Sequence, residues 1–278
     1  MRAESITECE ELVYLESSAW GWLARTEFQD VIAKLKSKSC VVVSSISAAE
    51  ALQNPNVHIR QRVCSVMCQV HSNEAPLLEP PLHLALKAGA AHRAGNNDFL
   101  FSESGPSPTL REAICGQRDA PVQEAYNWIQ NMEQNAERFL EEIRPEQLDW
   151  ETQYLDSRVL NRTDFLQLLA EYPPAKELSL SIGELRELCT KVDVWRATAG
   201  MLAYIITLAV RHAPKRWGGE RPGGADLWQT VYLGIANTFL SEDDWLLDAA
   251  NEIAIALFPH RRRVIRATDF FNSLRAAT

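Results

Sequence analysis

The sequence predicts an α/β protein whose central parallel sheet is interrupted by a large helical insertion. Three observations support this prediction. Short β-branched segments alternate with helical segments in residues 1–75, an order that favours a parallel sheet with crossover helices. Residues 76–214 show helical spacing with little strand character. Strand and helix patterns return in residues 215–278, so one discontinuous domain explains the chain more simply than three separate domains.

The first part of the chain gives two strands and three helical segments. Valines in a run bounded by serines indicate a strand at 40–43, and the basic residues near Lys38 suit the end of a helix. The sequence Asn54-Pro55-Asn56 ends the helix that opens at Ser47. The expected elements, in chain order, are a strand at 12–15, a helix at 20–38, a strand at 40–43, a helix opening at Ser47, and a helix at 57–70.

The middle of the chain is punctuated by prolines and is otherwise helical in pattern. Its clearest element is an amphipathic helix at Pro121–Ile143, whose apolar residues recur every three or four positions. Residues 123–156 are strongly acidic, which is typical of a solvated helical face. A partner protein could bind the same amphipathic helix.

The last part of the chain returns to alternating elements. Several basic residues gather around the glycine-rich segment 218–224. The expected elements that follow are a helix at 225–235, a strand at 237–240, a helix from Ser241 to 256, a strand at 261–265 and a short helix through Phe270-Phe271.

Composition and charge limit the function classes. The chain has 278 residues, of which 46% are hydrophobic and 23% charged, and this excludes wholesale disorder. A net charge of -9 argues against general binding to nucleic acid or to an anionic membrane, but it leaves room for a local basic groove. The longest apolar run, Ala197–Val210, is shorter than the roughly 20 residues of a membrane span. We expect a buried helix there and no membrane partner.

Six cysteines are scattered along the chain. The opening residues MRAESITECEELVYLE are acidic where a signal peptide would be basic and then apolar. We therefore expect a cytoplasmic location and free thiols. Cys64, Cys68 and His71 share one helical face and could hold zinc with a fourth ligand, although such cysteines more often pack in the core.

Four acidic residues follow expected strands or open expected helices, and they are the candidate catalytic and metal-binding residues. In an open parallel sheet, groups at the carboxyl ends of the strands meet in one crevice. Carboxylates that meet there repel one another, and a hard cation such as Mg²⁺ or Mn²⁺ removes the repulsion. The four residues are Glu16, Glu50, Asp226 and Asp243.

Each of these acids also has a structural interpretation. Ser47-x-x-Glu50 fits a capping box, and Ser241-x-x-Asp244 marks another helix start. Asp226 and Asp243 would be stabilised by a helix dipole without any function. Glu16 could be a strand-end acid that faces water. The order and surroundings of the four together favour the functional interpretation.

The residues around the four acids resemble the PIN-domain family of nucleases. The segment Leu12–Ser18 resembles the opening strand of the family, and Val41–Leu52 resembles its second strand, serine-rich turn and helix-borne glutamate. The most specific segment is Asp226–Asp243, which is similar to an aspartate-bearing helix followed by a strand and a Thr-x-Asp turn. The ending, Val264–Leu274, is similar to the final strand and helix. The resemblance covers about residues 11–75 and 216–278.

The resemblance implies a PIN-like three-layer α/β/α domain and a hydrolytic mechanism. The four acids would hold Mg²⁺ or Mn²⁺, which would activate a water molecule against a phosphodiester. Ser17 or Ser241 would orient a metal ligand, with Asp244 as a substitute for Asp243. Glu16 stands where the family usually has aspartate, and the extra methylene moves its carboxylate by about 1.5 Å. Phosphate contacts would come from Arg216 and Arg221, or from the run Arg261–Arg263.

The function expected from these features is that of a metal-dependent endoribonuclease, of a bacterial toxin-antitoxin or RNA-processing kind. Its substrate would be RNA, with single-stranded DNA as an alternative. An antitoxin or another protein partner and a homodimer are open alternatives. A hypothesis of a different class is an inactive PIN-like scaffold whose helical insertion binds a protein.

Overall fold

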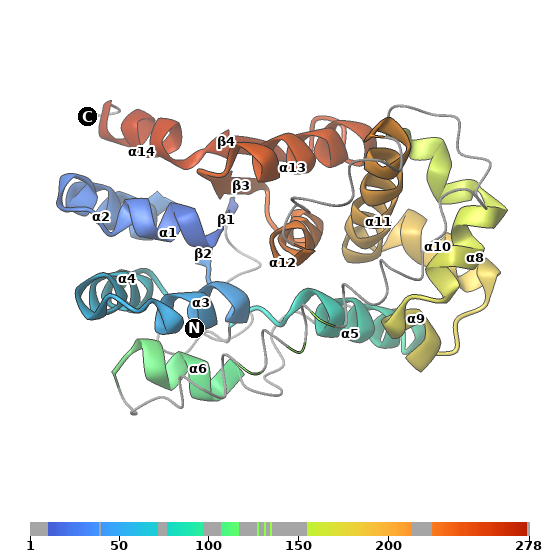
Figure 1. Ribbon diagram of the computed structural model, residues 1–278, viewed down its shortest axis with the longest axis horizontal. Coiled ribbons are helices and arrows are strands. Elements are labelled where there is room, and N and C mark those ends of the chain that lie inside the picture. The colour runs from blue at the N-terminus through green and yellow to red at the C-terminus, as the bar shows by residue number, and fades with distance from the viewer. Residues whose placement is uncertain are drawn as a thin grey trace.

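The centre of the molecule is a four-stranded parallel sheet (Figure 1). The computed structural model describes residues 11–38, 40–71, 77–96, 107–116, 127, 131, 134, 155–212 and 224–276. The strands are β1 (Leu12–Leu15), β2 (Cys40–Val42), β3 (Thr238–Ser241) and β4 (Arg263–Arg266), in the order β2-β1-β3-β4. The expected α/β class with a central parallel sheet is confirmed.

The strand order creates a switch point between β1 and β3. The chain leaves β1 toward β2 on one side and later returns to the other side as β3, and both neighbours are parallel to β1. Crevices at the carboxyl ends of strands form where the strand order reverses in this way. Ser44 and Leu78 add one further parallel bridge beyond the end of β2.

Helices connect the strands and cover both faces of the sheet. The chain passes from β1 to β2 through helical segments, and further helices follow β2. These elements are α1 (Ser17–Leu23), η2 (Thr26–Phe28), α2 (Gln29–Lys38), α3 (Ser45–Gln53), α4 (Val57–Val70), α5 (Pro81–Arg93) and α6 (Ser107–Ile114).

The described part of the region between residues 155 and 212 is helical, as the sequence predicts. Its elements are η4 (Ser157–Asn161), α8 (Thr163–Ala170), α9 (Pro173–Glu177), α10 (Ile182–Lys191) and α11 (Asp193–His212). The end of the chain contributes α12 (Gly224–Trp228), η6 (Gln229–Gly234), α13 (Asp244–Leu257) and α14 (Ala267–Ala276). None of the described helices is both long enough and apolar enough to span a membrane.

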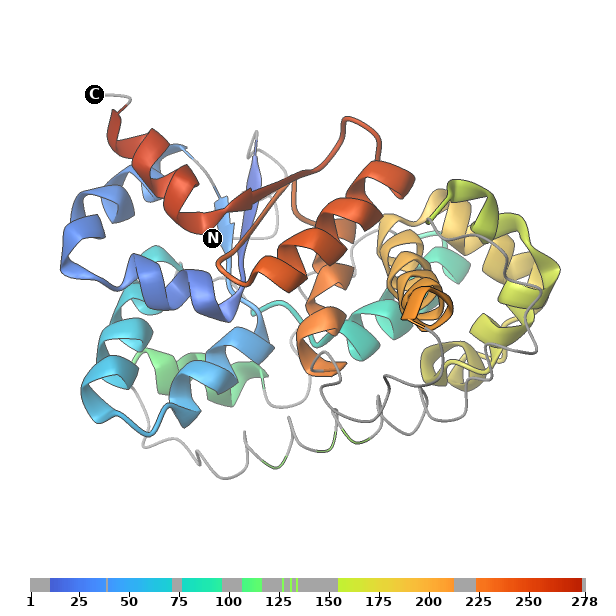
Figure 2. The same cartoon turned by 45° about the horizontal axis from the view of Figure 1, so that its top comes forward.

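Two apolar cores lie on opposite faces of the sheet. Tyr14 and Phe239 point into a core that is completed by α5, η4, α8 to α11, η6 and α13. Leu15 and Leu240 point into a second core with α1 to α4, α6 and α14. Figures 1 and 2 show the two groups of helices on either side of the strands. The helical middle of the chain therefore shares its core with one face of the sheet.

Several expected boundaries move in the structure. Ser44 is the N-cap of α3 and accepts from the Ser47 N–H, so the capping box proposed for Ser47 and Glu50 is wrong. Asp243 is the N-cap of α13, and Ser241 is still in β3. The helix expected at 225–235 divides into α12 and the 3₁₀ segment η6.

Most of the amphipathic helix expected at 121–143 lies outside the described residues. Asn127, Asn131 and Gln134 are described, and each is helical and exposed. These polar residues lie on the face that the sequence predicts to be solvated.

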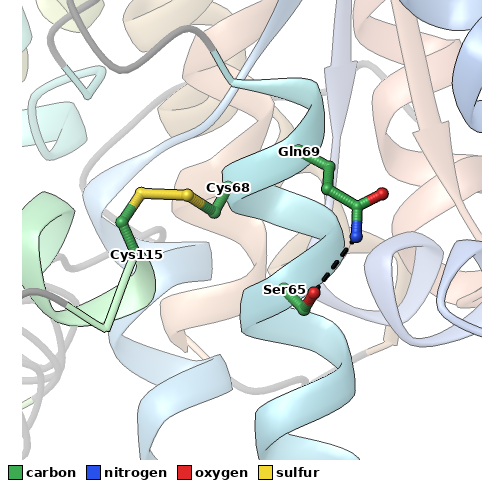
Figure 3. Close-up of a disulfide and its surroundings, with 4 residues drawn as sticks. All are labelled: Ser65, Cys68, Gln69 and Cys115. Carbon is green, nitrogen blue, oxygen red and sulfur yellow. Dashed lines mark hydrogen bonds between the residues drawn. A yellow bond between two sulfur atoms is a disulfide. The ribbon is translucent and has the colours of Figure 1, made fainter.

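The expectation of free thiols is wrong for three cysteines. A disulfide joins Cys68 on α4 to Cys115, just after α6, with Cα atoms 5.2 Å apart (Figure 3). Cys40 is also disulfide-bonded. Because the Cys68 sulfur is in a disulfide, the zinc alternative with Cys64 and His71 is wrong as well. Cys64 and Cys189 are free and buried.

Candidate acidic site at the carboxyl edge of the sheet

A row of polar residues crosses the sheet where its strands end. Leu15 on β1 pairs with Leu240 on β3, so the next residues, Glu16 and Ser241, lie side by side. The Glu16 N–H continues the ladder by donating to Leu240 O at 2.9 Å. Ser241 is in turn paired with Arg266 on β4. The switch point between β1 and β3 is therefore lined by Glu16 and Ser241.

Glu16 is held inside the protein by serine hydroxyls. It is 5% exposed, so the alternative interpretation of Glu16 as a strand-end acid that faces water is wrong. Oε1 accepts from the Ser18 N–H at 3.0 Å, which makes Glu16 the N-cap of α1. Oε2 accepts from the Ser18 hydroxyl and, at 2.9 Å, from the Ser241 hydroxyl.

Burial raises the pKa of the Glu16 carboxyl above its ordinary value. The hydrogen bonds from Ser18 and Ser241 favour the ionised form and oppose that increase in the pKa, while the negative charge of Asp226 adds to it. The ionised form of the Glu16 carboxyl is thus stabilised by hydrogen-bond donors but destabilised by burial and by the charge of Asp226.

The same two serines connect the end of β1 to the turn after β3. The Ser18 hydroxyl accepts from the Glu242 N–H at 2.9 Å, and the Ser241 hydroxyl accepts from the Asp243 N–H at 3.0 Å. Each serine therefore bonds both to Glu16 and to the β3–α13 turn. This arrangement fixes the position of Asp243 relative to Glu16.

Asp226 and Asp243 approach the row from two helices. Asp226 is half-buried on α12, and its pKa is raised first by burial and then by the negative charge of Asp243. Asp243 is exposed and accepts from the Leu246 N–H at 2.9 Å as the N-cap of α13. Charge repulsion therefore links Glu16 to Asp226 and Asp226 to Asp243.

Glu50 reaches the site through α1. It is half-buried on α3, and its Oε2 accepts from the Ser17 hydroxyl. Ser17 is the residue directly after Glu16. The expected role of Ser17 and Ser241 in orienting acidic side chains agrees with these contacts.

The structure brings the four predicted acids into one neighbourhood but not into a ready-made metal cage. Within the described ranges, no three histidine, cysteine, aspartate or glutamate side chains lie close enough together to hold one metal ion. The chemistry of the donor set still fits a hard cation, because all four groups are carboxylates and because burial, with a smaller contribution from a neighbouring acid, raises the pKa of Glu16 and of Asp226. Mg²⁺ usually keeps several waters and binds only one or two protein carboxylates directly.

The predicted phosphate-binding residues have mixed outcomes. Arg216 and Arg221 lie outside the described residues. Arg262 is bonded to Leu233 O at 2.7 Å and to Asp193 at 3.1 Å, which indicates a structural role. Arg263 begins β4 and pairs with Glu11, which precedes β1. Arg263 therefore lies at the amino ends of the strands, whereas Glu16 lies at their carboxyl ends.

Arg266 is a neighbour of the site that the sequence reasoning missed. It stands beside Ser241 on β4 and pairs with Glu242 and Asp244. Asp244, the proposed substitute for Asp243, is 81% exposed and points to Arg266. Only the exact register of β3 and β4 places Arg266 here, and the sequence does not give that register.

Comparisons of the chain with protein-family models, with curated proteins and with solved structures found no match. The function therefore has to be argued from the fold and from this acidic site.

Proposed function

We propose that the protein is a metal-dependent endoribonuclease whose active site is the acidic group at the β1–β3 switch point. The observation that carries the proposal is the convergence of Glu16, Asp226 and Asp243: besides burial, the charge of Asp226 raises the pKa of Glu16, and the charge of Asp243 raises the pKa of Asp226. Glu50 joins them through Ser17. Structural acids gain nothing from such repulsion, whereas sites that bind cations commonly hold perturbed carboxylates.

The residues have distinct roles in the proposed reaction. Asp226 and Asp243 would hold a divalent cation directly, Glu50 would contact the water molecules of that cation, and Glu16 would contribute negative charge. Ser17 holds Glu50, and Ser18 with Ser241 holds Glu16. A bound Mg²⁺ or Mn²⁺ supplies an acidified water and charge stabilisation for phosphodiester hydrolysis. The resemblance to PIN-domain nucleases supports RNA as the substrate and a toxin-antitoxin or RNA-processing role.

The test is cleavage of labelled RNA and labelled single-stranded DNA with Mn²⁺ or Mg²⁺. We expect RNA cleavage that EDTA abolishes and that Asp226→Asn lowers at least about 100-fold. Asp248→Asn is the matched control, because Asp248 is an exposed aspartate on α13 that makes no contact in the site. Equal cleavage by the wild type and Asp226→Asn would indicate a contaminating nuclease and would contradict the proposal.

The Glu16→Asp variant tests whether the length of the glutamate side chain limits the rate of RNA cleavage. Aspartate would withdraw the carboxylate by about 1.5 Å, a displacement of the size that can change a rate 10²-fold. A higher rate in the variant would show that the natural site is detuned. A lower rate would show that Ser18 and Ser241 are arranged for glutamate.

A second candidate, an inactive scaffold that binds a protein partner, is favoured by one observation. Both carboxylate oxygens of Glu16 already accept hydrogen bonds within the chain. If this network only closes the crevice, Asp226→Asn and the wild type will both lack cleavage and will bind Mn²⁺ equally poorly. The helical middle would then be the region in which to look for a partner.

A further inference from the structure

Three acids of the site each have a buried polar residue two or three positions away along the chain. Side chains two residues apart on an extended chain point to the same side, and side chains three apart on a helix lie one above the other. The three pairs are Tyr14 with Glu16 on β1, Ser47 with Glu50 on α3, and Gln229 with Asp226 where α12 runs into η6.

The deeper residues bond to one another. We call Tyr14, Ser44, Ser47 and Gln229 the polar floor, and all four are fully buried. The Tyr14 hydroxyl donates to Gln229 Oε1 at 2.5 Å and lies 3.4 Å from Ser44 Oγ and 3.5 Å from Ser47 Oγ. Ser44 Oγ donates to Ser47 Oγ at 3.0 Å. The polar floor therefore joins β1, α3 and η6 close in the chain to Glu16, Glu50 and Asp226.

The carboxamide of Gln229 is only half satisfied. Its Oε1 accepts from Tyr14, whereas its Nε2 is buried and has no acceptor in the described parts of the chain. Buried amide donors in proteins nearly always have a partner. Gln229 lies on the same helical face as Asp226. Its unpaired Nε2 donor therefore indicates a ligand at the acidic site, and this indication is independent of the acidic residues themselves.

We propose that Gln229 is a ligand-binding and positioning residue of the acidic site. Tyr14, whose hydroxyl contacts Ser44 and Ser47, fixes the carboxamide, and Nε2 donates to a ligand oxygen between Glu50 and Asp226. That oxygen belongs either to a cation-bound water or to a phosphate group. The inference rests on the proposed cation site. It adds that the uncharged amide of Gln229 binds a ligand oxygen beside the carboxylates.

The experiment compares Tyr14→Phe, Gln229→Met and Gln229→Glu with the wild type. Thr230→Val is the matched control, because Thr230 is fully buried beside Gln229 and its hydroxyl donates to Leu227 O at 2.7 Å, away from the floor. The Mn²⁺ dissociation constant is measured with and without inorganic phosphate. The pH dependence of the unfolding free energy is measured in EDTA.

We expect Gln229→Met and Tyr14→Phe to weaken Mn²⁺ binding at least about tenfold, the usual loss when a residue behind a metal ligand is changed. Gln229→Glu should bind Mn²⁺ more tightly, because a carboxylate oxygen replaces Nε2. In EDTA, Tyr14→Phe should flatten the pH dependence of stability, since the acids can move apart. Thr230→Val should lose stability but keep the wild-type Mn²⁺ affinity and pH dependence.

The phosphate arm identifies the source of the ligand oxygen. A loss of affinity in Gln229→Met without phosphate indicates a water, and a loss seen only with phosphate indicates a substrate oxygen. Wild-type values for Gln229→Met and Tyr14→Phe in both arms and in EDTA would overturn the inference. If the wild type itself binds no Mn²⁺, the proposed function fails, while the EDTA measurement on Tyr14→Phe still decides whether the floor positions the acids. Tyr14→Phe keeps the aromatic packing, so it is the variant that folds most readily.

Discussion

Glu16 and Asp226 reduce the stability of the folded chain at neutral pH. Burial is the largest cause of the raised pKa of each carboxyl, and a neighbouring acid adds to it. Ionised carboxylates in such surroundings cost free energy unless donors or a cation offset the cost. The Ser18 and Ser241 hydroxyls donate hydrogen bonds to Glu16. Among the described residues, no hydroxyl donates such a hydrogen bond to Asp226.

The first prediction is that Asp226→Asn stabilises the metal-free protein. The folded-state pKa of Asp226 lies above its ordinary value of 3.8, so its stabilising contribution is complete at lower pH and is lost as pH rises through the raised pKa. Above that pKa the charged group is a penalty that asparagine lacks. We expect a gain on the order of 1 kcal/mol at pH 7 that disappears below about pH 4. Urea unfolding in EDTA from pH 4 to 8 measures it.

Asp248→Asn is the control for this prediction, since Asp248 is an exposed aspartate of α13 and lies outside the hydrogen-bond network of the acidic site. Its unfolding free energy should follow the wild type at every pH. A loss of stability in Asp226→Asn at pH 7 would mean that Asp226 makes favourable contacts, and the repulsion described above would be wrong.

Helix α6 is attached to the protein by few side chains and one covalent bond. Leu110, Ala113 and Ile114 reach the second core, and Cys115 follows them with its disulfide to Cys68. Figure 3 shows the disulfide running from α4 to the end of α6. The two cysteines are 47 residues apart, so the bond closes a long loop in the unfolded chain.

The second prediction concerns this disulfide. Cys115→Ser should lower the unfolding free energy by up to about 4 kcal/mol under non-reducing conditions, because the unfolded chain regains the entropy of the open loop. Denaturant unfolding with and without a dithiol reductant measures the change. The wild type should lose stability on reduction. Equal stabilities of the oxidised wild type and Cys115→Ser would contradict the prediction.

The close packing of η6 against the start of α11 leaves no room for a side chain at Gly234. A Cβ atom there would lie 2.5 Å from Val194 Cα and 2.7 Å from Asp193 O, and both are backbone atoms that cannot rotate away. The third prediction is that Gly234→Ala costs about 1–3 kcal/mol. Gly21 is the matched control, because a Cβ atom there meets nothing within 4 Å and Gly21→Ala should stabilise α1 by about 0.5–1 kcal/mol. Thermal unfolding of both variants measures the difference, and a neutral Gly234→Ala would show that this packing yields.

The strands and the helices α3, α4 and α13 follow from the sequence because their signals are local, whereas the single helix expected at 20–38 is wrong, since that segment divides into α1, η2 and α2. The β-branched run before Ser44 and the break at Asn54–Asn56 locate β2, α3 and α4 closely. Caps are less predictable because several hydroxyl residues compete for one position, as Ser44 and Ser47 do. The disulfide depends on a contact between α4 and α6 that no local pattern specifies.

The acidic site could be predicted only in part, for the same reason. Residues at strand ends and helix starts gave Glu16, Glu50, Asp226 and Asp243. The polar floor was missed. Tyr14 has a signal, since it stands two residues before Glu16 in a strand, but Gln229 contributes only through a long-range contact 215 residues away in sequence.

At the scale of the whole molecule, the helical middle and the sheet share one apolar core. Tyr14 and Phe239 from the sheet lie in the same cluster as Trp195 and Leu202 from α11. Without the described helices between 155 and 212, much of the apolar core that this face of the sheet shares with η6 and α13 would be exposed to water. A large apolar face cannot remain exposed in a stable soluble domain.

The fourth prediction follows from this shared core. We expect the chain to unfold in a single cooperative transition, with equal calorimetric and van't Hoff enthalpies. A chain in which a short linker replaces residues 76–214 should fail to fold. Two separate transitions, or a folded chain without the middle, would show that the sheet and the helical region are independent domains.

In the proposed function, the acids at the β1–β3 switch point bind a divalent cation, and calorimetric titration of the whole chain with Mn²⁺ measures that binding. Asp226→Asn and Asp248→Asn are titrated beside the wild type at the same pH. We expect saturable binding to the wild type, at least about tenfold weaker binding to Asp226→Asn, and wild-type affinity for Asp248→Asn. Equal affinities for all three proteins, or no binding to the wild type, would contradict the proposed function.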